Sequence, residues 1–165
     1  MPDPVAAGWA ALAGGRWQDA AEAFTAVVAQ DATAEALHGL GTALWWLGQQ
    51  RRHVELLTAA FAGYRRNRDH ASAVLVALDL CCTFKSNYGD VAVAAGWLRR
   101  AERLASEGVP RAWVQVMRAY LAPADPGALD RARSALDAGV RHGDTDLELC
   151  ALSTIGHALV LAGRV

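Results

Sequence analysis

Apolar residues recur at intervals of three and four positions along most of this chain. In the segment 37–44, Leu37, Leu40, Gly41 and Leu44 stand at i, i+3, i+4 and i+7, so they share one face of a helix. Four further segments follow the same spacing, namely 4–11, 77–84, 113–120 and 152–159. Because no segment sustains an alternation with a period of two, the pattern predicts an all-α fold without a sheet.

A second set of helices is indicated by glycines that follow these segments. These glycines are spaced by 33 to 41 residues: Gly15, Gly48, Gly89, Gly127 and Gly163. Nine positions after the first four stand the large apolar residues Phe24, Leu57, Leu98 and Leu136. Residues five and twelve positions after them are mostly small, which lets a neighbouring helix approach closely. The sequence therefore predicts one array over residues 1–165, with repeats at 1–34, 35–70, 71–108, 109–145 and an incomplete 146–165.

This arrangement resembles the tetratricopeptide repeat, a helix-turn-helix unit. The resemblance is carried by the segments 37–44, 15–27 and 152–163. This chain departs from the repeat in two respects. Ala32 and Asn67 stand near the places where a proline usually closes the first two repeats, and His53 replaces a small residue. The resemblance implies an α–α superhelix of tandem hairpins, whose first helices line a concave binding groove.

A narrower resemblance concerns the helical-repeat region of bacterial LuxR-type transcriptional regulators. It is carried by "LGTALWWLG" within 36–48, by "GDVAVAAGWLRRAERL" at 89–104 and by the link "YRRNRDHASA". This similarity implies the N-terminal sensor or interaction part of such a regulator, with a separate DNA-binding domain. The alternative is a stand-alone adaptor or assembly protein that has no DNA-binding partner domain.

The repeat register assigns candidate binding residues to the groove. The assigned positions are Glu35, His38, Thr42, Trp45, Trp46, Cys82, Lys85, Ser86, Arg118, Ser153 and His157. Trp45 and Trp46 are adjacent, so on a helix they point about 100° apart and cannot both fill one hairpin core. Two interpretations remain open: both tryptophans pack between neighbouring repeats, or they form the aromatic floor of a site for a protein, a peptide or a small molecule.

The charge and the apolar content of the chain bear on which classes of function are expected. With 16 basic and 17 acidic residues the formal net charge is −1, so we expect no direct DNA binding by this segment. No apolar run is long enough for a membrane span, and the N-terminus lacks the basic and apolar regions of a secretory signal. The expected location is therefore the cytoplasm. There, Cys81, Cys82 and Cys150 are expected to be free, buried thiols.

The sequence contains no catalytic signature. Phosphate loops, HExxH, Cys-x-x-Cys and Gly-x-Ser-x-Gly motifs are all missing, and the histidines are scattered. His70 falls in a stretch that reads as a polar linker. We therefore expect no enzymatic activity, no metal and no cofactor.

The last predicted helix has an apolar face formed by Leu152, Ile155 and Leu159. In a repeat array, a following helix covers such a face. The sequence assigns no such helix to the fifth repeat. We therefore expect either self-association through this C-terminal helix or fraying after about Asp146.

Overall fold

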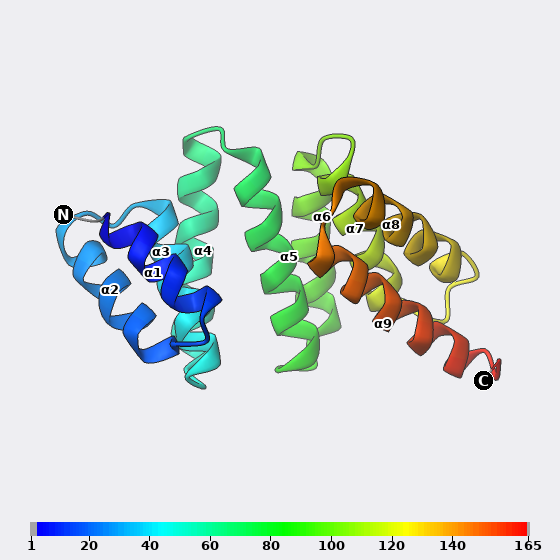
Figure 1. The fold of residues 1–165 in the computed structure, drawn as a ribbon. Coiled ribbons are helices and arrows are strands. Elements are labelled where there is room, and N and C mark those ends of the chain that lie inside the picture. The colour runs from blue at the N-terminus through cyan, green and yellow to red at the C-terminus, as the bar shows by residue number, and fades with distance from the viewer. Residues whose placement is uncertain (1–2, 165) are drawn as a thin grey trace. The chain divides into compact units, whose positions relative to one another are not determined.

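The computed structural model describes residues 3–164, and within that range every regular element is an α-helix (Figure 1). The helices are α1 (Pro4–Ala13), α2 (Trp17–Gln30), α3 (Ala34–Trp46), α4 (Gln50–Arg66), α5 (His70–Ser86), α6 (Val91–Leu104), α7 (Val109–Leu121), α8 (Ala128–His142) and α9 (Thr145–Leu161). Helices that follow one another are joined by short turns and pack together in both halves of the chain. The prediction of an all-α fold built from helical hairpins is confirmed.

The helix ends follow from local hydrogen bonding. Asp3, Thr33, Asp90 and Asp144 each precede a helix and accept a hydrogen bond from a backbone N–H of its first turn. Gly15 adopts a φ of +70°, a left-handed conformation that ends α1 and that side chains with a Cβ disfavour.

His70 corrects a sequence-based expectation, because it is the first residue of α5 and does not lie in a linker. Only three residues, Asn67 to Asp69, connect α4 and α5. The side chain of Asp69 accepts a hydrogen bond of 3.0 Å from the backbone N–H of Ser72, which stabilises the start of α5.

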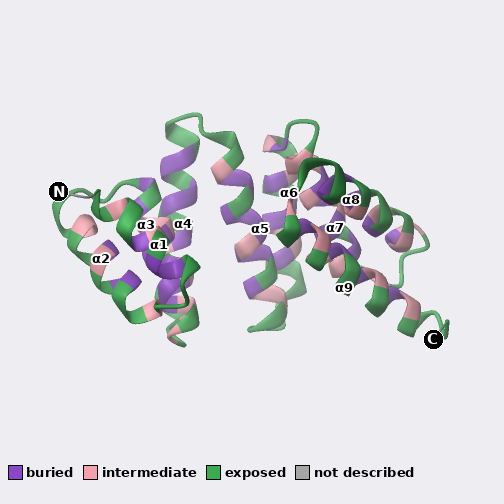
Figure 2. Cartoon of the chain, in the orientation of Figure 1, coloured by how far each residue is buried: buried purple, intermediate pink, exposed green. Residues whose placement is uncertain are grey.

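The chain divides into two compact units, Met1–Val76 and Ala77–Val165, and the division falls within α5. Unit 1 contains α1 to α4, in which α1 packs on α2 and α3, α2 on α3, and α3 on α4. Unit 2 contains α6 to α9, in which α7 contacts α6, α8 and α9, and α8 contacts α9. Figure 2 shows that buried residues line the helix faces that meet within each unit.

The core of unit 1 is organised around Phe24 of α2, whose side chain is fully buried. A Cβ added to Gly8 of α1 or to Gly39 of α3 would lie only 2.7 Å or 2.2 Å from Cζ of Phe24. The ring therefore packs directly against the backbones of both neighbouring helices. Trp9 contacts the same ring edge-to-face, with 5.4 Å between the ring centroids.

The hairpin of α3 and α4 uses a similar arrangement. Leu57 of α4 packs over Gly41 of α3, where an added Cβ would lie 2.3 Å from Cδ1 of Leu57. His53, which replaces a small residue, is buried, with its Nδ1 2.9 Å from the carbonyl oxygen of Gly41. Since a carbonyl only accepts, the ring Nδ1–H donates this bond, and a backbone acceptor satisfies the buried histidine.

Unit 2 has a core rich in alanine. Fully buried alanines let helices α6 to α9 approach closely: Ala94, Ala101, Ala119, Ala132, Ala135 and Ala151. Larger side chains fill the remaining space, among them Val116 and Leu147, which are also fully buried.

The cysteines only partly follow the sequence-based expectation. All three are free, but Cys81 alone is buried, while Cys150 is half-buried and Cys82 is exposed. The reason is helical geometry: adjacent residues point about 100° apart, so when Cys81 faces the core Cys82 turns away from it. Burial raises the pKa of the Cys81 thiol to about 12. Cys81 therefore carries no thiolate near neutral pH.

Candidate functional site

The predicted groove residues of unit 1 lie along α3, and the first turns of that helix are covered by α1. The indole Nε1–H of Trp9 donates a hydrogen bond of 3.1 Å to Oε1 of Glu35. The same indole ring meets the imidazole of His38 edge-to-face, with 5.3 Å between centroids. Glu35 is exposed and His38 is half-buried, so the structure brings these two candidates together around Trp9.

His38 lies in a partly apolar environment that opposes its protonation. Its Nδ1 is 3.4 Å from the hydroxyl of Tyr64 on α4, and the two rings are perpendicular. Burial, assisted by the nearby His53, lowers the pKa of His38 to about 4. The imidazole is therefore neutral at pH 7.

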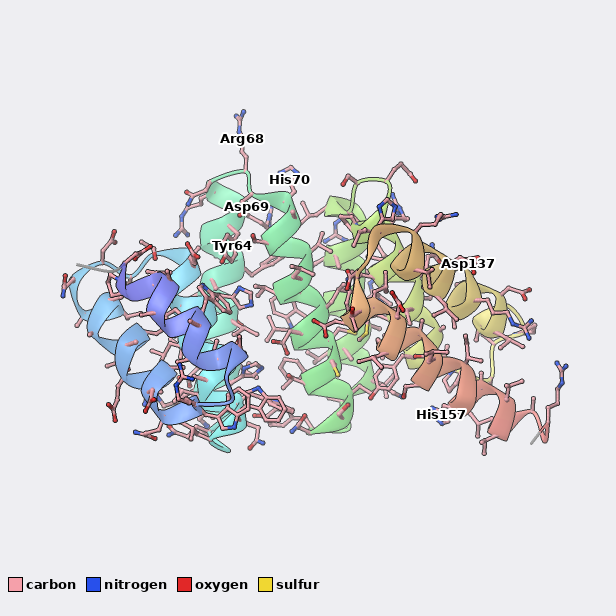
Figure 3. All side chains as sticks on the ribbon, viewed as in Figure 1. Tyr64, Arg68, Asp69, His70, Asp137 and His157 are labelled. Carbon is pink, nitrogen blue, oxygen red and sulfur yellow. The ribbon has the colours of Figure 1, made fainter. Side chains whose placement is uncertain are left out.

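Tyr64 resists ionisation for related reasons. Burial, followed by the negative charges of Glu35 and Asp69, raises the pKa of Tyr64 to about 12. Figure 3 shows Tyr64 on α4, below the turn that carries Asp69. The His38–Tyr64 pair is thus neutral near pH 7, and neither group is tuned for general acid–base catalysis at that pH.

Thr42 lies near the middle of α3, and its side chain bonds to the backbone of that helix. Its hydroxyl donates a hydrogen bond of 3.0 Å to the carbonyl oxygen of His38. Both lone pairs of the hydroxyl oxygen are left to accept bonds from other groups.

Trp45 and Trp46 at the end of α3 form an aromatic cluster with Trp17 at the start of α2. Trp46 stacks on Trp17 with 4.6 Å between centroids and 9° between planes. Trp45 meets Trp46 edge-to-face at 4.7 Å. Trp46 nevertheless remains 53% exposed, so its ring contacts two other indoles and is still largely open to solvent. We call Trp17, Trp45 and Trp46 the tryptophan cluster.

The repeat register did not place Trp17 beside Trp46. The sequence nevertheless indicates this pairing through the glycines of the two turns. Trp17 stands two positions after Gly15, and Trp46 stands two positions before Gly48. Because consecutive helices run antiparallel, the start of α2 lies level with the end of α3. Placing the two helices side by side therefore brings Trp17 and Trp46 to the same height.

A cleft of about 450 Å³ lies between α2 and the end of α3 in unit 1. Its lining is mainly apolar and includes Leu44 and Leu47 together with polar side chains. The residues that line it are Gln18, Ala21, Glu22, Thr25, Ala26, Ala29, Leu44, Leu47 and Gln49. The lining runs along α2 from Gln18 to Ala29, and at one end Gln18 and Leu47 are the sequence neighbours of Trp17 and Trp46.

In unit 2, the candidates on α5 meet Tyr120 of α7. The ammonium of Lys85 lies 5.3 Å from the centroid of the Tyr120 ring, and the hydroxyls of Ser86 and Tyr120 are 2.6 Å apart. The thiol of Cys82 lies 3.8 Å from the Ser86 hydroxyl. Tyr120, which the repeat register assigned to the hairpin core, is therefore part of this polar group.

The remaining candidates of unit 2 differ in their surroundings. Arg118 of α7 forms an ion pair with Glu102 of α6, and its Nε donates a hydrogen bond of 3.1 Å to Oε1 of that residue. Ser153 and His157 are exposed on α9, where Figure 3 shows His157 on the outer side of the helix.

Between residues 3 and 164, no three His, Cys, Asp or Glu side chains gather in a way that could hold a metal ion. Within the same range, no helix combines the length and apolar character needed to cross a membrane. No family model and no curated protein matches this sequence.

Proposed function

We propose that this chain is a helical-repeat scaffold that binds a peptide or a protein segment through the tryptophan cluster and the adjoining cleft. The observation that carries the proposal is the exposure of Trp46, which is 53% exposed while stacked on Trp17. Leaving so much of an indole in water forgoes the stabilisation that burial would give. Tryptophan is also enriched among the residues that dominate binding energy at protein interfaces.

The surroundings of Trp46 suit a peptide ligand. Stacking on Trp17 and the contact with Trp45 hold the indole in one orientation, so little conformational entropy is lost on binding. The neighbouring cleft offers Leu44 and Leu47 to an apolar side chain of the ligand. Gln18, Glu22 and Gln49, which also line the cleft, supply hydrogen-bonding groups for a peptide backbone.

The biological setting that we propose is the N-terminal interaction part of a bacterial LuxR-type transcriptional regulator, built from tetratricopeptide-like repeats. The segments 36–48 and 89–104 support it by their resemblance to that family. The alternative is a stand-alone adaptor, for which the same binding surface would serve. The coding sequence beyond residue 165 distinguishes the two, because a helix-turn-helix DNA-binding module is expected only for the regulator.

The first prediction tests the binding surface. Panning a phage-displayed random peptide library on the purified chain should enrich peptides with apolar or aromatic residues. Replacing Trp46 with alanine should weaken their binding at least about tenfold, as measured by fluorescence anisotropy, because an interface tryptophan contributes about 2 kcal/mol or more. Tyr88→Ala is the matched control, since Tyr88 is an aromatic residue of unit 2 that is 49% exposed.

Circular dichroism should give the same helix content for both variants. The proposal is wrong if no peptide is enriched, or if the enriched peptides bind the Trp46→Ala variant as tightly as the original chain.

The second prediction concerns nucleic acid. The isolated chain is expected to bind duplex DNA weakly, without a complex below about 1 µM at physiological salt and without preference between unrelated sequences. Its net charge of −1 provides no basic field, and Arg118 is paired with Glu102. A mobility-shift assay that detects a tight, sequence-specific complex would contradict this expectation.

A further inference from the structure

Unit 2 contains a cleft between α7 and α8 whose ionisable residues are mostly basic. The two helices are packed neighbours within this unit (Figure 1), and the cleft between them has a volume of about 230 Å³. It shares no residue with the peptide site proposed above. The polar residues that line it are Glu107, Arg111, Gln115, Ser134, Arg141 and His142.

The space in this cleft is left by small side chains, and Arg111 is fixed beside it. Ala112 of α7 and Ala135 and Ala138 of α8 line the cleft and are buried. Nη2 of Arg111 donates a hydrogen bond of 3.1 Å to the carbonyl oxygen of Ala105. This bond uses one of the five N–H groups of the guanidinium, so the others can bond to a ligand.

The positive charges of the cleft are poorly compensated. Arg141 is exposed, and between residues 3 and 164 it forms no ion pair. Glu107 is the one carboxylate among the lining residues, and its closest oxygen lies 4.0 Å from Nη2 of Arg111. Because the Glu107 side chain is 93% exposed, this ion pair is worth little, and an anion bound in the cleft could replace it.

The surroundings of the cleft leave this positive charge in place. The carboxylate of Asp144 is held by the indole of Trp113 and by the backbone N–H of Leu147, and Asp137 of α8 does not line the cleft. The start of α7 and the end of α8 both border the cleft, so their helix dipoles oppose each other there. The side chains therefore decide the sign of the local potential.

We propose that this cleft binds a phosphate group between Arg111 and Arg141. The planar fork of each guanidinium can bond two phosphate oxygens at once. A phosphate monoester carries about 1.5 to 2 negative charges at pH 7, which suits two arginines better than the single charge of a carboxylate. Ser134 and Gln115 add a hydroxyl and an amide that can donate to the remaining oxygen.

The test is isothermal titration calorimetry of the 165-residue chain with glucose 6-phosphate and, separately, with inorganic phosphate. At least one of them should bind with a dissociation constant at or below about 1 mM, and glucose should not bind at the same concentration. Tighter binding of glucose 6-phosphate would assign the cleft to a small phosphate ester. Equal binding, or tighter binding of inorganic phosphate, would assign it to the free ion.

Variants locate the bound phosphate. Arg111→Gln and Arg141→Gln should each weaken binding at least about tenfold, because each removes charge-assisted hydrogen bonds. Ser134→Asp places a carboxylate at an exposed position of the lining and should weaken binding by a similar factor without disturbing the core. The matched control is Arg133→Gln, which removes the same charge from an exposed arginine of α8 outside the cleft. It should change the dissociation constant less than about threefold, since such a charge is screened.

Two results would overturn the proposal. One is the absence of binding by either phosphate at about 10 mM. The other is binding that Arg133→Gln weakens as much as Arg111→Gln and Arg141→Gln do, which would indicate unspecific attraction to surface charge. Circular dichroism of every variant verifies that the helices remain folded.

Discussion

Replacing Phe24 with alanine is expected to lower the free energy of unfolding by about 3–5 kcal/mol, the upper range for the loss of a buried aromatic ring. The side chain is fully buried and packs between Gly8 and Gly39, neither of which has a side chain that could move into the vacated space. Trp9 would lose its edge-to-face contact at the same time. Because the surrounding backbone cannot collapse easily, most of the cavity should persist.

Urea denaturation followed by circular dichroism measures this loss. Val140→Ala is the control, since Val140 is 62% exposed and its truncation should change the free energy by less than about 0.5 kcal/mol. The converse variant, Gly39→Ala, places a Cβ 2.2 Å from the Phe24 ring and should cost about 1–3 kcal/mol through overpacking. A loss below about 1 kcal/mol for Phe24→Ala would show that the ring does not hold α1, α2 and α3 together.

The hydrophobic spacing was sufficient to predict the helices and part of the core. It missed the buried face of α9, which is formed by Leu147, Ala151, Thr154 and Ala158. Leu40, Gly41 and Leu44, assigned to one helix face, are all buried. The reason is that a helix of fixed pitch brings residues three and four apart onto the face that its neighbour covers. The start of α5 could not be found in this way, because it is set by a hydrogen bond from Ser72 to Asp69 within a polar segment.

Large aromatic residues were harder to place than aliphatic ones. Trp113 and Tyr120 have the spacing of core residues in α7, yet both are only half-buried. Each keeps a polar atom bonded at its tip: Trp113 donates to Asp144 at 2.9 Å, and Tyr120 bonds to Ser86. An aromatic side chain can satisfy apolar and polar surroundings together, so spacing alone does not decide its burial.

The sequence predicted the positions of the candidate site residues along their own helix. It did not predict their contacts with residues of other helices. The register placed Glu35, His38 and Trp45 along α3, but the partners that define their environment lie on other helices. Trp9 and Tyr64 come from α1 and α4. Such contacts depend on how hairpins pack against one another, which the period of one helix does not specify.

Acidification is expected to destabilise the chain through His38. The pKa of this residue is about 4 in the folded chain, against an ordinary value of 6.5. Between those two pH values the unfolded chain binds a proton at this position and the folded chain does not. Stability is therefore fully present above about pH 6.5 and is lost as the pH falls toward 4, by up to about 3 kcal/mol from this group.

His38→Gln is the informative variant, since glutamine remains neutral at every pH and can still bond to the Tyr64 hydroxyl. The free energy of unfolding, measured by urea denaturation from pH 7.5 to pH 4, should fall more steeply for the original chain than for the variant. The difference should approach 1.4 kcal/mol per pH unit in this window, because one proton separates the two states. Parallel curves, or an NMR titration midpoint of His38 near 6.5, would mean that the imidazole is accessible to water and that α1 and α4 do not enclose it.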